Sequence, residues 1–370
     1  MEKLFVGLMS GTSVDSIDSV LLDLSNNKIQ ILEENTTEIK KGLKSKILNA
    51  VNKNNLSDEE IKELDFELGL NFGMAVLNLL NKSSLDISEV SAIGSHGQTI
   101  KHSPHLPDPI SLQIGDPKEI SKLTGIKTVA NFRKADIKAG GEGAPLAPLF
   151  HQFILRLNAL SSAVIINIGG ISNITKLTDL GKKVIAFDCG PGNCLMDAWS
   201  REHGKGNFDE KGKWASSGKL LPELFEEMIN DSFFKTLPPK STGTDYFNLD
   251  WIKNKTVHLK SPPSSEDVQA TLTELTAKSI FLELENLDAL NEKVYICGGG
   301  IHNNLLINKL ENLIKNKTFS TSSLGFSPDF LEACCFGWLA QQRLKGNKFD
   351  LSTITGSKGK VMLGEIWEPH

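Results

Sequence analysis

The sequence predicts an α/β protein built from two duplicated domains, each with a mixed β-sheet flanked by helices. Two copies of one local pattern support this: an apolar strand enters a turn of small residues and leaves as a second strand, at residues 4–22 and 163–177. Each copy is followed by a third strand and then by helices and further strands, an order typical of α/β domains. A chain of 370 residues also exceeds what one hydrophobic core usually supports.

In the first half, alternating apolar residues predict three closely connected strands, which form an antiparallel meander. A helical region follows, where Ser57 and Glu60 form a capping box ahead of a long amphipathic helix. Helix and strand then alternate. The expected strands are 4–8, 16–23, 28–34, 90–95 and 126–130, and the expected helices are 43–52, one that starts after Ser57 and reaches Leu79, and 117–123.

The second half repeats this order after a glycine-rich segment at residues 139–145 and a helix that reaches Leu157. We place the first domain at residues 1–135, with 345–370 as a candidate completion of it, and the second domain at residues 136–344. The expected strands here are 163–168, 172–177, 183–187 and 294–297, and the expected helices are 191–201, 217–231, 266–287, 303–315 and 328–344.

Composition excludes several classes of protein. With 40 Lys and Arg against 45 Asp and Glu the net charge is -5, and no basic block marks a surface for nucleic acid or anionic membrane. The five cysteines form no Cys-x-x-Cys pair and have apolar neighbours, which indicates reduced, buried thiols. We expect a cytoplasmic protein, because no leader-like segment and no apolar run of about 18 residues occurs.

The turn between the first two strands has the features of a phosphate-binding loop. Its small residues let consecutive backbone N–H groups face one oxyanion, and Ser10, Thr12 and Ser13 add hydroxyl donors. Asp15 and Asp18 are candidates to hold the waters of a magnesium ion. Ordinary turn chemistry, with a solvated Asp18, is the alternative.

Two common nucleotide-binding motifs are absent. The chain has no Gly-x-x-x-x-Gly-Lys-Ser/Thr, which excludes a P-loop. Gly169 and Gly170 in the second turn are followed by strand residues rather than by a helix, so they do not form the dinucleotide fingerprint. Phosphate binding therefore requires another architecture.

Asp188 is the candidate general base. It stands at the end of an apolar strand, directly before the Gly190-Pro191-Gly192 turn that opens a helix. A carboxylate at a helix N-terminus in a cleft is placed to deprotonate a hydroxyl or a water close to a bound phosphate. The alternative is a cap on the helix that follows Pro191.

Two further segments are candidates for ligand binding. Gly298, Gly299 and Gly300 follow an apolar strand and would let the backbone approach a flat ligand such as adenosine, although a flexible turn explains them as well. His96 and Gln98 end a strand among small residues, which suits sugar hydroxyls. A lone histidine there is more often structural.

Two charged residues complete the candidate set. Arg133 precedes the glycine-rich segment, where it fits either a substrate carboxylate or a surface ion pair with Asp136. Glu332 lies in an otherwise apolar helix, and a carboxylate among core residues needs a ligand hydroxyl, an amide or a cation as its partner.

Taken together, these segments resemble the signature segments of the anhydro-N-acetylmuramic acid kinase family, within the actin-like and sugar-kinase superfamily. The resemblance runs from residue 7 to Leu363-Gly364 and implies duplicated actin-like, ribonuclease H-like domains with an ATP cleft between them. The segments that carry it are 7–15, 95–99, 167–173, 187–193, 297–300 with Asn303, Glu332-Ala333 and Thr355-Gly356.

The resemblance also implies an activity. Members of the family phosphorylate 1,6-anhydro-N-acetylmuramic acid at O6 with ATP and open the anhydro ring with water, which gives N-acetylmuramic acid 6-phosphate for cell-wall recycling. Matched motif by motif, Asp188 becomes the base that activates water. The implied substrate-binding residues are His96, Gln98, Arg133 and Glu332.

For the nucleotide, the resemblance implies ATP with Mg²⁺, the metal having no direct protein ligand and contacting Asp15 and Asp18 through water. It also implies a homodimer that binds neither nucleic acid nor membrane. The implied ATP-binding residues are Gly11, Thr12, Ser13, Val14, Asp15, Ser16, Ile17, Asp18, Gly169, Gly170, Gly298, Gly299, Gly300 and Asn303.

Two residues depart from the family pattern. Ser16 stands where the family usually has glycine, which raises the question of a positive φ there, and Cys189 stands where threonine is common, beside the catalytic carboxylate. Two other functions are open: a nucleotide-gated actin-like binding ATPase that hydrolyses ATP without a sugar acceptor, and a kinase of another amino sugar. The polar groups at His96, Gln98, Asp188 and Glu332 favour a small substrate.

Overall fold

The chain divides into two compact units. The computed structural model describes residues 3–369 except 26–27, 54–55, 104–108, 180 and 182. Unit 1 consists of residues 1–150 and 330–370, and unit 2 consists of residues 151–329. This division differs from the expected domain boundaries, because residues 136–150 and 330–344 belong to unit 1 rather than to the second domain.

Unit 1 is organised around one mixed sheet. Its first three strands form the expected antiparallel meander, and two further strands continue parallel to the first. The C-terminal strand pairs antiparallel with the last of these, so residues near the end of the chain do complete this sheet. The order is β15 (Glu365–Trp367), β7 (Thr128–Ala130), β4 (Val90–Ser95), β1 (Leu4–Met9), β2 (Ser16–Asp23) and β3 (Gln30–Glu38).

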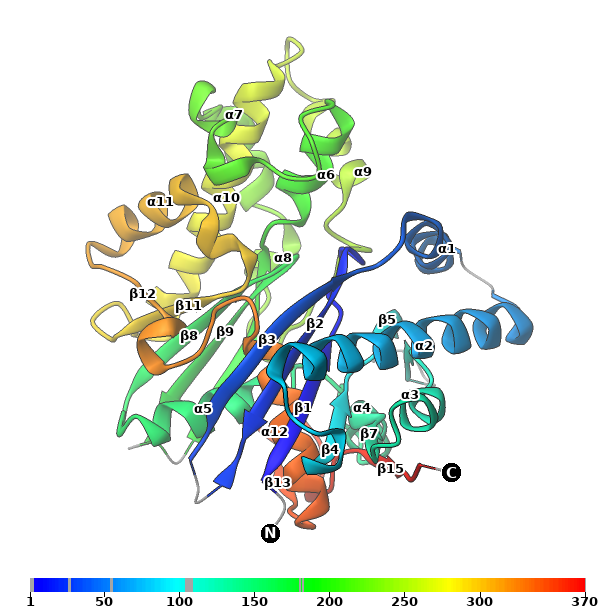
Figure 1. Ribbon diagram of the computed structural model, residues 1–370. Coiled ribbons are helices and arrows are strands. Elements are labelled where there is room, and N and C mark those ends of the chain that lie inside the picture. Colours follow the sequence, from blue (N-terminus) through cyan, green and yellow to red (C-terminus); the bar gives the residue numbers. More distant parts are fainter. Residues whose placement is uncertain are drawn as a thin grey trace. The chain divides into compact units, whose positions relative to one another are not determined.

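Helices cover both faces of this sheet (Figure 1). Along β1, Val6 and Leu8 point to one face and pack in one core with Leu68 and Phe72 of α2 (Asp58–Ser83). Successive strand residues point to opposite faces, so Gly7 faces the other side, where α12 (Leu331–Leu344) lies.

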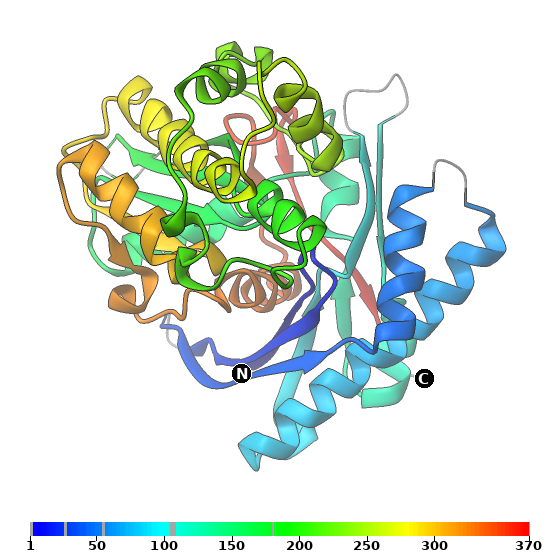
Figure 2. The ribbon, with the colours of Figure 1, turned by 90° about the horizontal axis from the view of Figure 1, so that it is seen from above.

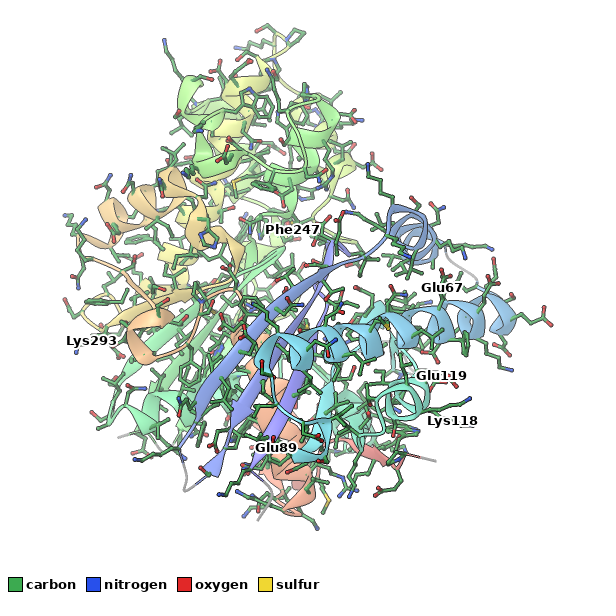
Figure 3. The ribbon with its side chains drawn as sticks, viewed as in Figure 1. Glu67, Glu89, Lys118, Glu119, Phe247 and Lys293 are labelled. Carbon is green, nitrogen blue, oxygen red and sulfur yellow. The ribbon has the colours of Figure 1, made fainter. Side chains whose placement is uncertain are left out.

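Two shorter helices lie beside α2, which begins with the expected Ser57 and Glu60 capping box. These are α1 (Lys41–Asn52) and α3 (Pro117–Thr124). An ion pair of 2.8 Å joins Lys46 of α1 to Glu67 of α2, and Figure 3 labels Glu67 on the long helix. The three helices therefore form one layer of unit 1.

Unit 2 repeats the sheet of unit 1. Its first three strands are an antiparallel meander and the next two continue parallel to the first. The first five strands of unit 1 have the same order and directions, so the expected duplication is confirmed. The order is β10 (Lys183–Pro191), β9 (Ile171–Thr178), β8 (Ala163–Ile168), β11 (Val294–Cys297) and β12 (Phe319–Ser320).

A helical segment between β10 and β11 builds much of the unit 2 core. The buried side chains of Trp199, Phe247, Leu272 and Ile280 pack there against Phe187 of β10. Viewed from above, the long α10, in yellow, runs beside α11, in orange (Figure 2). The helices between β10 and β11 are α6 (Cys194–Glu202), α7 (Pro222–Ile229), α8 (Ser232–Lys235), α9 (Leu249–Thr256) and α10 (Ser265–Asn286), and α11 (Asn304–Ile314) follows β11.

The packing of α12 explains why the expected boundary at residue 344 is wrong. A Cβ atom on Gly7 would collide with the backbone carbonyl of Ala333, and one on Gly94 with that of Phe336. The helix backbone thus lies directly on β1 and β4, which places residues 331–344 in unit 1. The helix at 147–157, α5 (Ala147–Leu157), contains the division between the units.

Several short elements were not expected from the sequence. In unit 1 these are the hairpin of β5 (Gln98–Ser103) and β6 (Ile110–Ile114), the helix α4 (Phe132–Lys138), and the pair β13 (Phe349–Asp350) and β14 (Lys360–Val361). Among the described residues, no helix combines the length and the apolar character needed to cross a membrane.

The contact between α12 and the sheet predicts the effect of two alanine substitutions. Gly94→Ala should lower the free energy of unfolding by roughly 1–3 kcal/mol, because the new methyl group meets a backbone that cannot move without unpacking α12. Gly42→Ala in α1 is the control: nothing lies within 4 Å of its Cβ position, so we expect equal or higher stability. Urea unfolding followed by circular dichroism measures both, and a Gly94→Ala protein as stable as the unmodified chain would contradict the packing.

Candidate functional site

The loop between β1 and β2 is tied to β5 by two buried polar residues. The Ser10 hydroxyl lies 2.7 Å from Oε1 of Gln98 and 2.9 Å from the carbonyl oxygen of Ser16. Nε2 of Gln98 donates to the carbonyl of Thr99 at 3.3 Å. Ser10 and Gln98 are 2% and 1% exposed. Their side chains hold the loop in place, and the contacts of Ser10 with a phosphate and of Gln98 with a sugar stay predictions.

The tip of this loop is exposed to solvent, and Val14 within it has a left-handed backbone conformation. Thr12 and Ser13 are exposed, whereas Val14 is buried with φ of 55° and donates its N–H to the carbonyl of Gly11 at 3.1 Å. A left-handed conformation costs a side-chain-bearing residue about 1–2 kcal/mol, which the burial of Val14 in the unit 1 core offsets. Ser16 is an ordinary β2 residue paired with Glu38, so its departure from glycine is compatible with the loop.

The two aspartates of the loop differ in their surroundings. Asp15 forms an ion pair with Lys44 of α1. Oδ1 of Asp18 accepts a hydrogen bond from the Thr36 hydroxyl at 2.9 Å, and the charge of Asp18 contributes to a raised pKa of Glu332. The charge of Asp18 therefore acts on Glu332, another candidate residue of unit 1. The carboxylate of Asp15 is instead ion-paired with Lys44.

A metal ion at this loop would need ligands from elsewhere. Within the described ranges, no group of three or more His, Cys, Asp and Glu side chains could hold a metal. Magnesium is usually bound through one or two carboxylates, phosphate oxygens and several waters, rather than by an all-protein cage. The residues present fit a magnesium ion that arrives with a nucleotide.

Arg133 donates hydrogen bonds to His96 in unit 1. Nε2 of His96 lies 3.1 Å from Nε and 2.8 Å from Nη2 of Arg133, and Nδ1 lies 2.9 Å from the carbonyl oxygen of Gly97. The guanidinium only donates, so Nε2 accepts and the ring proton is on Nδ1. Burial, and then the charge of Arg133, hold the pKa of His96 well below its usual range. The imidazole is therefore neutral and orients the guanidinium.

Glu332 supplies the opposite charge from α12. Burial raises the pKa of Glu332, while the nearby Arg133 opposes that rise; burial also lowers the pKa of Arg133 to about 10, against the charge of Glu332. One turn further along α12, the ring of Phe336 lies 4.6 Å from that of His96, measured between centroids. The helix thus delivers both a carboxylate and an aromatic ring to the same pair of residues.

Asp136 holds the glycine-rich segment and is not an exposed partner of Arg133. The carboxylate is fully buried. Its Oδ2 accepts from the N–H of Gly143 and its Oδ1 from the hydroxyl of Thr355, each at 2.7 Å. The alternative of a surface ion pair between Arg133 and Asp136 is therefore wrong, because Asp136 joins residue 143 to the C-terminal segment.

In unit 2, Asp188 stands at an irregularity near the end of β10. The register of β10 with β9 shifts between Asp188 and Gly190, which is a bulge of the kind that redirects a side chain. Oδ2 of Asp188 accepts from the N–H of Thr242 at 2.9 Å. The N-cap residue of α6 is Asn193, so the helix-cap alternative for Asp188 is not what the structure contains.

Cys189 directly follows Asp188 in β10. Its side chain is fully buried in the unit 2 core, and burial raises the pKa of the thiol well above its usual value. The replacement of threonine by cysteine at this position is therefore a change in the apolar core, where a small neutral thiol packs well.

The glycines of unit 2 have separate roles. The carbonyls of Gly169 and Gly170 accept from the N–H groups of Asn193, at 2.8 Å, and Gly192, at 2.9 Å, while the N–H of Gly169 donates to Ile171 at 3.2 Å. The second turn is thus joined to the 190–194 turn by its carbonyls, and the N–H of Gly169 is already used.

The segment after β11 contains one glycine with room beside it. Gly298 has φ of 78°, and a Cβ there would meet Asn167 and Ile168; a Cβ on Gly300 would also meet Ile168. Beside Gly299 the nearest atom lies 3.9 Å away. Asn303, expected at the nucleotide, accepts from the N–H of Leu306 at 3.1 Å as the N-cap of α11.

Sequence patterns did not single out three residues that the structure places beside the candidates. Lys44 contacts Asp15, Thr242 contacts Asp188, and Lys240 accepts the N–H of Asp188 with its carbonyl at 3.1 Å. Each is distant along the chain from its partner. Only the Pro238-Pro239-Lys240 sequence, a lysine after two prolines in a stretch without apolar periodicity, signals an unusual segment.

The chain matches known proteins over nearly all its length. A family model described as anhydro-N-acetylmuramic acid kinase matches residues 3–369. The chain is 44% identical over 367 residues to an anhydro-N-acetylmuramic acid kinase of Coxiella burnetii, covering 98% of this chain and 97% of that protein. For the protein of the same name from Xylella fastidiosa the identity is 41% over 368 residues, covering 98% and 96%.

Solved structures resemble the chain more distantly. An activator of 2-hydroxyisocaproyl-CoA dehydratase from Clostridium difficile with bound ADPNP matches with a TM-score of 0.44 and 12% identity, covering 94% of this chain and 99% of that one. No conclusion depends on this likeness. The match of the family model over residues 3–369 and the relatives above 40% identity establish that the chain belongs to the anhydro-N-acetylmuramic acid kinase family.

Proposed function

We propose that the chain is an ATP-dependent kinase that converts 1,6-anhydro-N-acetylmuramic acid and water into N-acetylmuramic acid 6-phosphate, in the recycling of cell-wall murein. The observation that carries the proposal is Asp188, a carboxylate redirected by a bulge and held by the Thr242 N–H, in a chain that belongs to this family from residue 3 to residue 369. Its residues suit a reaction that needs a base for water.

Asp188 is the proposed base. It accepts a proton from a water that attacks the anomeric carbon C1, the C1–O6 bond breaks, and O6 takes the phosphoryl group while ADP leaves. The protein contributes position and charge rather than covalent chemistry, as is usual for phosphoryl transfer. Oδ2 accepts the Thr242 N–H, which helps to orient the carboxylate for this role.

Arg133, His96 and Glu332 of unit 1 form the proposed sugar-binding element. A muramic acid carries a lactyl carboxylate, and the guanidinium of Arg133 is the chemical match for such a group. His96 stays neutral and fixes the orientation of Arg133, while Glu332 accepts hydrogen bonds from sugar hydroxyls or the amide. Gln98, expected to contact the sugar, is assigned instead to holding the phosphate loop, because it is buried against Ser10.

The loop at residues 11–18 is the proposed phosphate-binding element for ATP. The exposed Thr12 and Ser13 offer hydroxyls at its tip, and Asp18 is the carboxylate that we assign to the waters of Mg²⁺. A bound Mg²⁺ would supply positive charge to the phosphates. On the adenosine side we assign Gly299, which has open space beside it, with Gly298 and Gly300 fixing its position.

We also propose a homodimer and a cytoplasmic location, both of which extend the family resemblance. Light scattering on a size-exclusion column measures the first. The two other functions considered for this sequence predict different products: a binding ATPase releases phosphate without a sugar acceptor, and a kinase of another amino sugar prefers a substrate that lacks the lactyl ether.

Oxygen labelling tests the reaction and the role of Asp188. With ATP, Mg²⁺ and 1,6-anhydro-N-acetylmuramic acid in ¹⁸O water, mass spectrometry should find a 6-phosphorylated sugar with ¹⁸O at C1. Asp188→Asn should lower kcat by roughly 10²–10⁴-fold, the usual contribution of a general base. Unlabelled product would exclude water attack at C1, and ATP turnover without sugar product would favour the binding ATPase.

A substitution at Gly11 in the first loop should weaken ATP binding without changing the stability of the fold. Gly11 has no positive φ and nothing lies within 4 Å of its Cβ position, so Gly11→Ala should leave the unfolding midpoint unchanged. A methyl group there would separate the backbone from a phosphate, and we expect KM for ATP to rise about tenfold, the equivalent of 1.4 kcal/mol. Gly42→Ala is the control, and an unchanged KM for ATP in Gly11→Ala would remove this glycine from the nucleotide site.

The neutral state of His96 predicts the pH dependence of sugar use. Its pKa lies well below the usual 6.5, so the imidazole does not gain a proton as the pH falls from 8 to 6. The profile of kcat/KM for the sugar should therefore show no limb near pH 6.5 from this residue. His96→Gln should raise KM for the sugar, because the flexible amide oxygen holds Arg133 less narrowly than the buried imidazole does, and should keep the shape of the profile over this range. A limb near pH 6.5 that disappears in His96→Gln would contradict the assignment.

A further inference from the structure

Lys240 and Glu283 form an ion pair buried inside unit 2. Their side chains are 2% and 4% exposed, and Nζ of Lys240 lies 2.7 Å from Oε1 of Glu283. The ammonium also lies 4.8 Å from the ring centroid of Phe233. Oε2 of Glu283 accepts from Nδ2 of Asn286 at 3.2 Å. Both charges are therefore compensated by groups of unit 2.

The lysine comes from an irregular connection that is largely exposed. This connection, residues 236–248, joins α8 to α9; residues 236–239 and 244–246 are exposed, whereas Lys240 and Phe247 are buried. Phe247, labelled in Figure 3, contacts the rings of Phe233 and Trp251. One apolar and one charged anchor thus attach the connection to the body of unit 2.

Between these anchors the connection holds Asp188 at two points. The carbonyl of Lys240 accepts the N–H of Asp188 at 3.1 Å, and the N–H of Thr242 donates to Oδ2 of Asp188 at 2.9 Å. Asp188 pairs with Asn173 of β9, and the register of the ladder shifts directly after it, before Gly190. The backbone at 240–242 adds two hydrogen bonds to Asp188 beside that pairing.

Stability alone is a poor explanation for the buried charges. Removing two ions from water is costly, and apolar side chains of similar volume are often as stabilising as a buried ion pair or more so. A charged pair with a short, directed hydrogen bond fixes the position of its backbone more narrowly than apolar contacts do. The chain here uses such a pair at Lys240, whose own backbone carbonyl accepts the N–H of Asp188.

We propose that Lys240 and Glu283 are positioning residues for Asp188: their buried ion pair sets the place of the 240–242 backbone, which orients the carboxylate toward the water it activates. Neither side chain touches the substrate. The inference rests on the proposed function, because it assigns the pair to the base of that reaction.

The test removes both charges together. Lys240→Met/Glu283→Leu leaves no unpaired buried ion, and we expect kcat to fall roughly 10- to 100-fold, the scale on which a displacement of about 1 Å acts. KM for ATP and for 1,6-anhydro-N-acetylmuramic acid should change less than about threefold, since neither binding element contains the pair. Calorimetric titration with ATP gives the fraction of folded protein, to which kcat is normalised.

A second ion pair of unit 2 provides a matched control. Lys176 and Glu292 lie 3.2 Å apart with side chains 12% and 18% exposed. Lys176→Met/Glu292→Leu makes the same chemical change without touching the 236–248 connection, and its kcat should equal that of the unmodified enzyme. If the first double variant does not bind ATP stoichiometrically, Lys240→Gln/Glu283→Gln, which keeps a neutral hydrogen-bonding pair, replaces it, with a smaller fall in kcat expected.

A mutant cycle with Asp188→Asn separates positioning from a general loss of structure. If the pair acts through Asp188, the triple variant should have the residual turnover of Asp188→Asn alone. A further fall in the triple variant, an unchanged kcat in the double variant, or an effect on KM instead of kcat would each overturn the inference. If Asp188→Asn itself turns over normally, the proposed base is wrong and the inference fails with it, an outcome distinct from failure of the pair alone.

Discussion

The contact of α12 with the backbone of β1 and β4 is the constraint on which unit 1 depends. Gly7 and Gly94 leave no room for a side chain between sheet and helix, so α12 packs against the strands themselves. This close contact fixes the position of the helix along its axis. It therefore also fixes Glu332, which lies near Arg133, and Phe336, one turn later, which contacts His96. A shift of α12 would displace an anion and an aromatic ring together.

Burial then gives this cluster its charge states. The pKa of Glu332 is raised and those of His96 and Arg133 are lowered, in each case with burial as the largest cause. A neutral histidine that accepts from the guanidinium leaves Arg133 charged but held in one orientation, which is the arrangement that a bidentate contact to a carboxylate requires. The same residues in water would have neither the fixed orientation nor the perturbed pKa values.

In unit 2 the orientation of Asp188 is fixed by a connection between two helices rather than by a helix packed on the sheet. This candidate base pairs with Asn173 directly before a register shift in the β-ladder. A connection between two helices adds two hydrogen bonds to this residue, and that connection is itself held by one buried ion pair and one buried aromatic residue. Orientation at both sites thus comes from segments far from the candidate residues in sequence.

Features that depend on neighbouring residues can be predicted from the amino-acid sequence. The strand-turn-strand repeats, the Ser57 capping box, the position of Asp188 at a strand end and the family segments were all readable, because period, capping and turn chemistry act over a few residues. The long helices were found for the same reason.

The folded structure alone shows what depends on contacts between distant segments. It placed residues 330–344 in unit 1, turned Ser10 and Gln98 into a tether, located the positive φ at Val14, and paired Lys240 with Glu283. No local pattern encodes these partners, since a buried polar group is compensated by whichever donor or charge the packed fold brings beside it, and packing is a property of the whole unit.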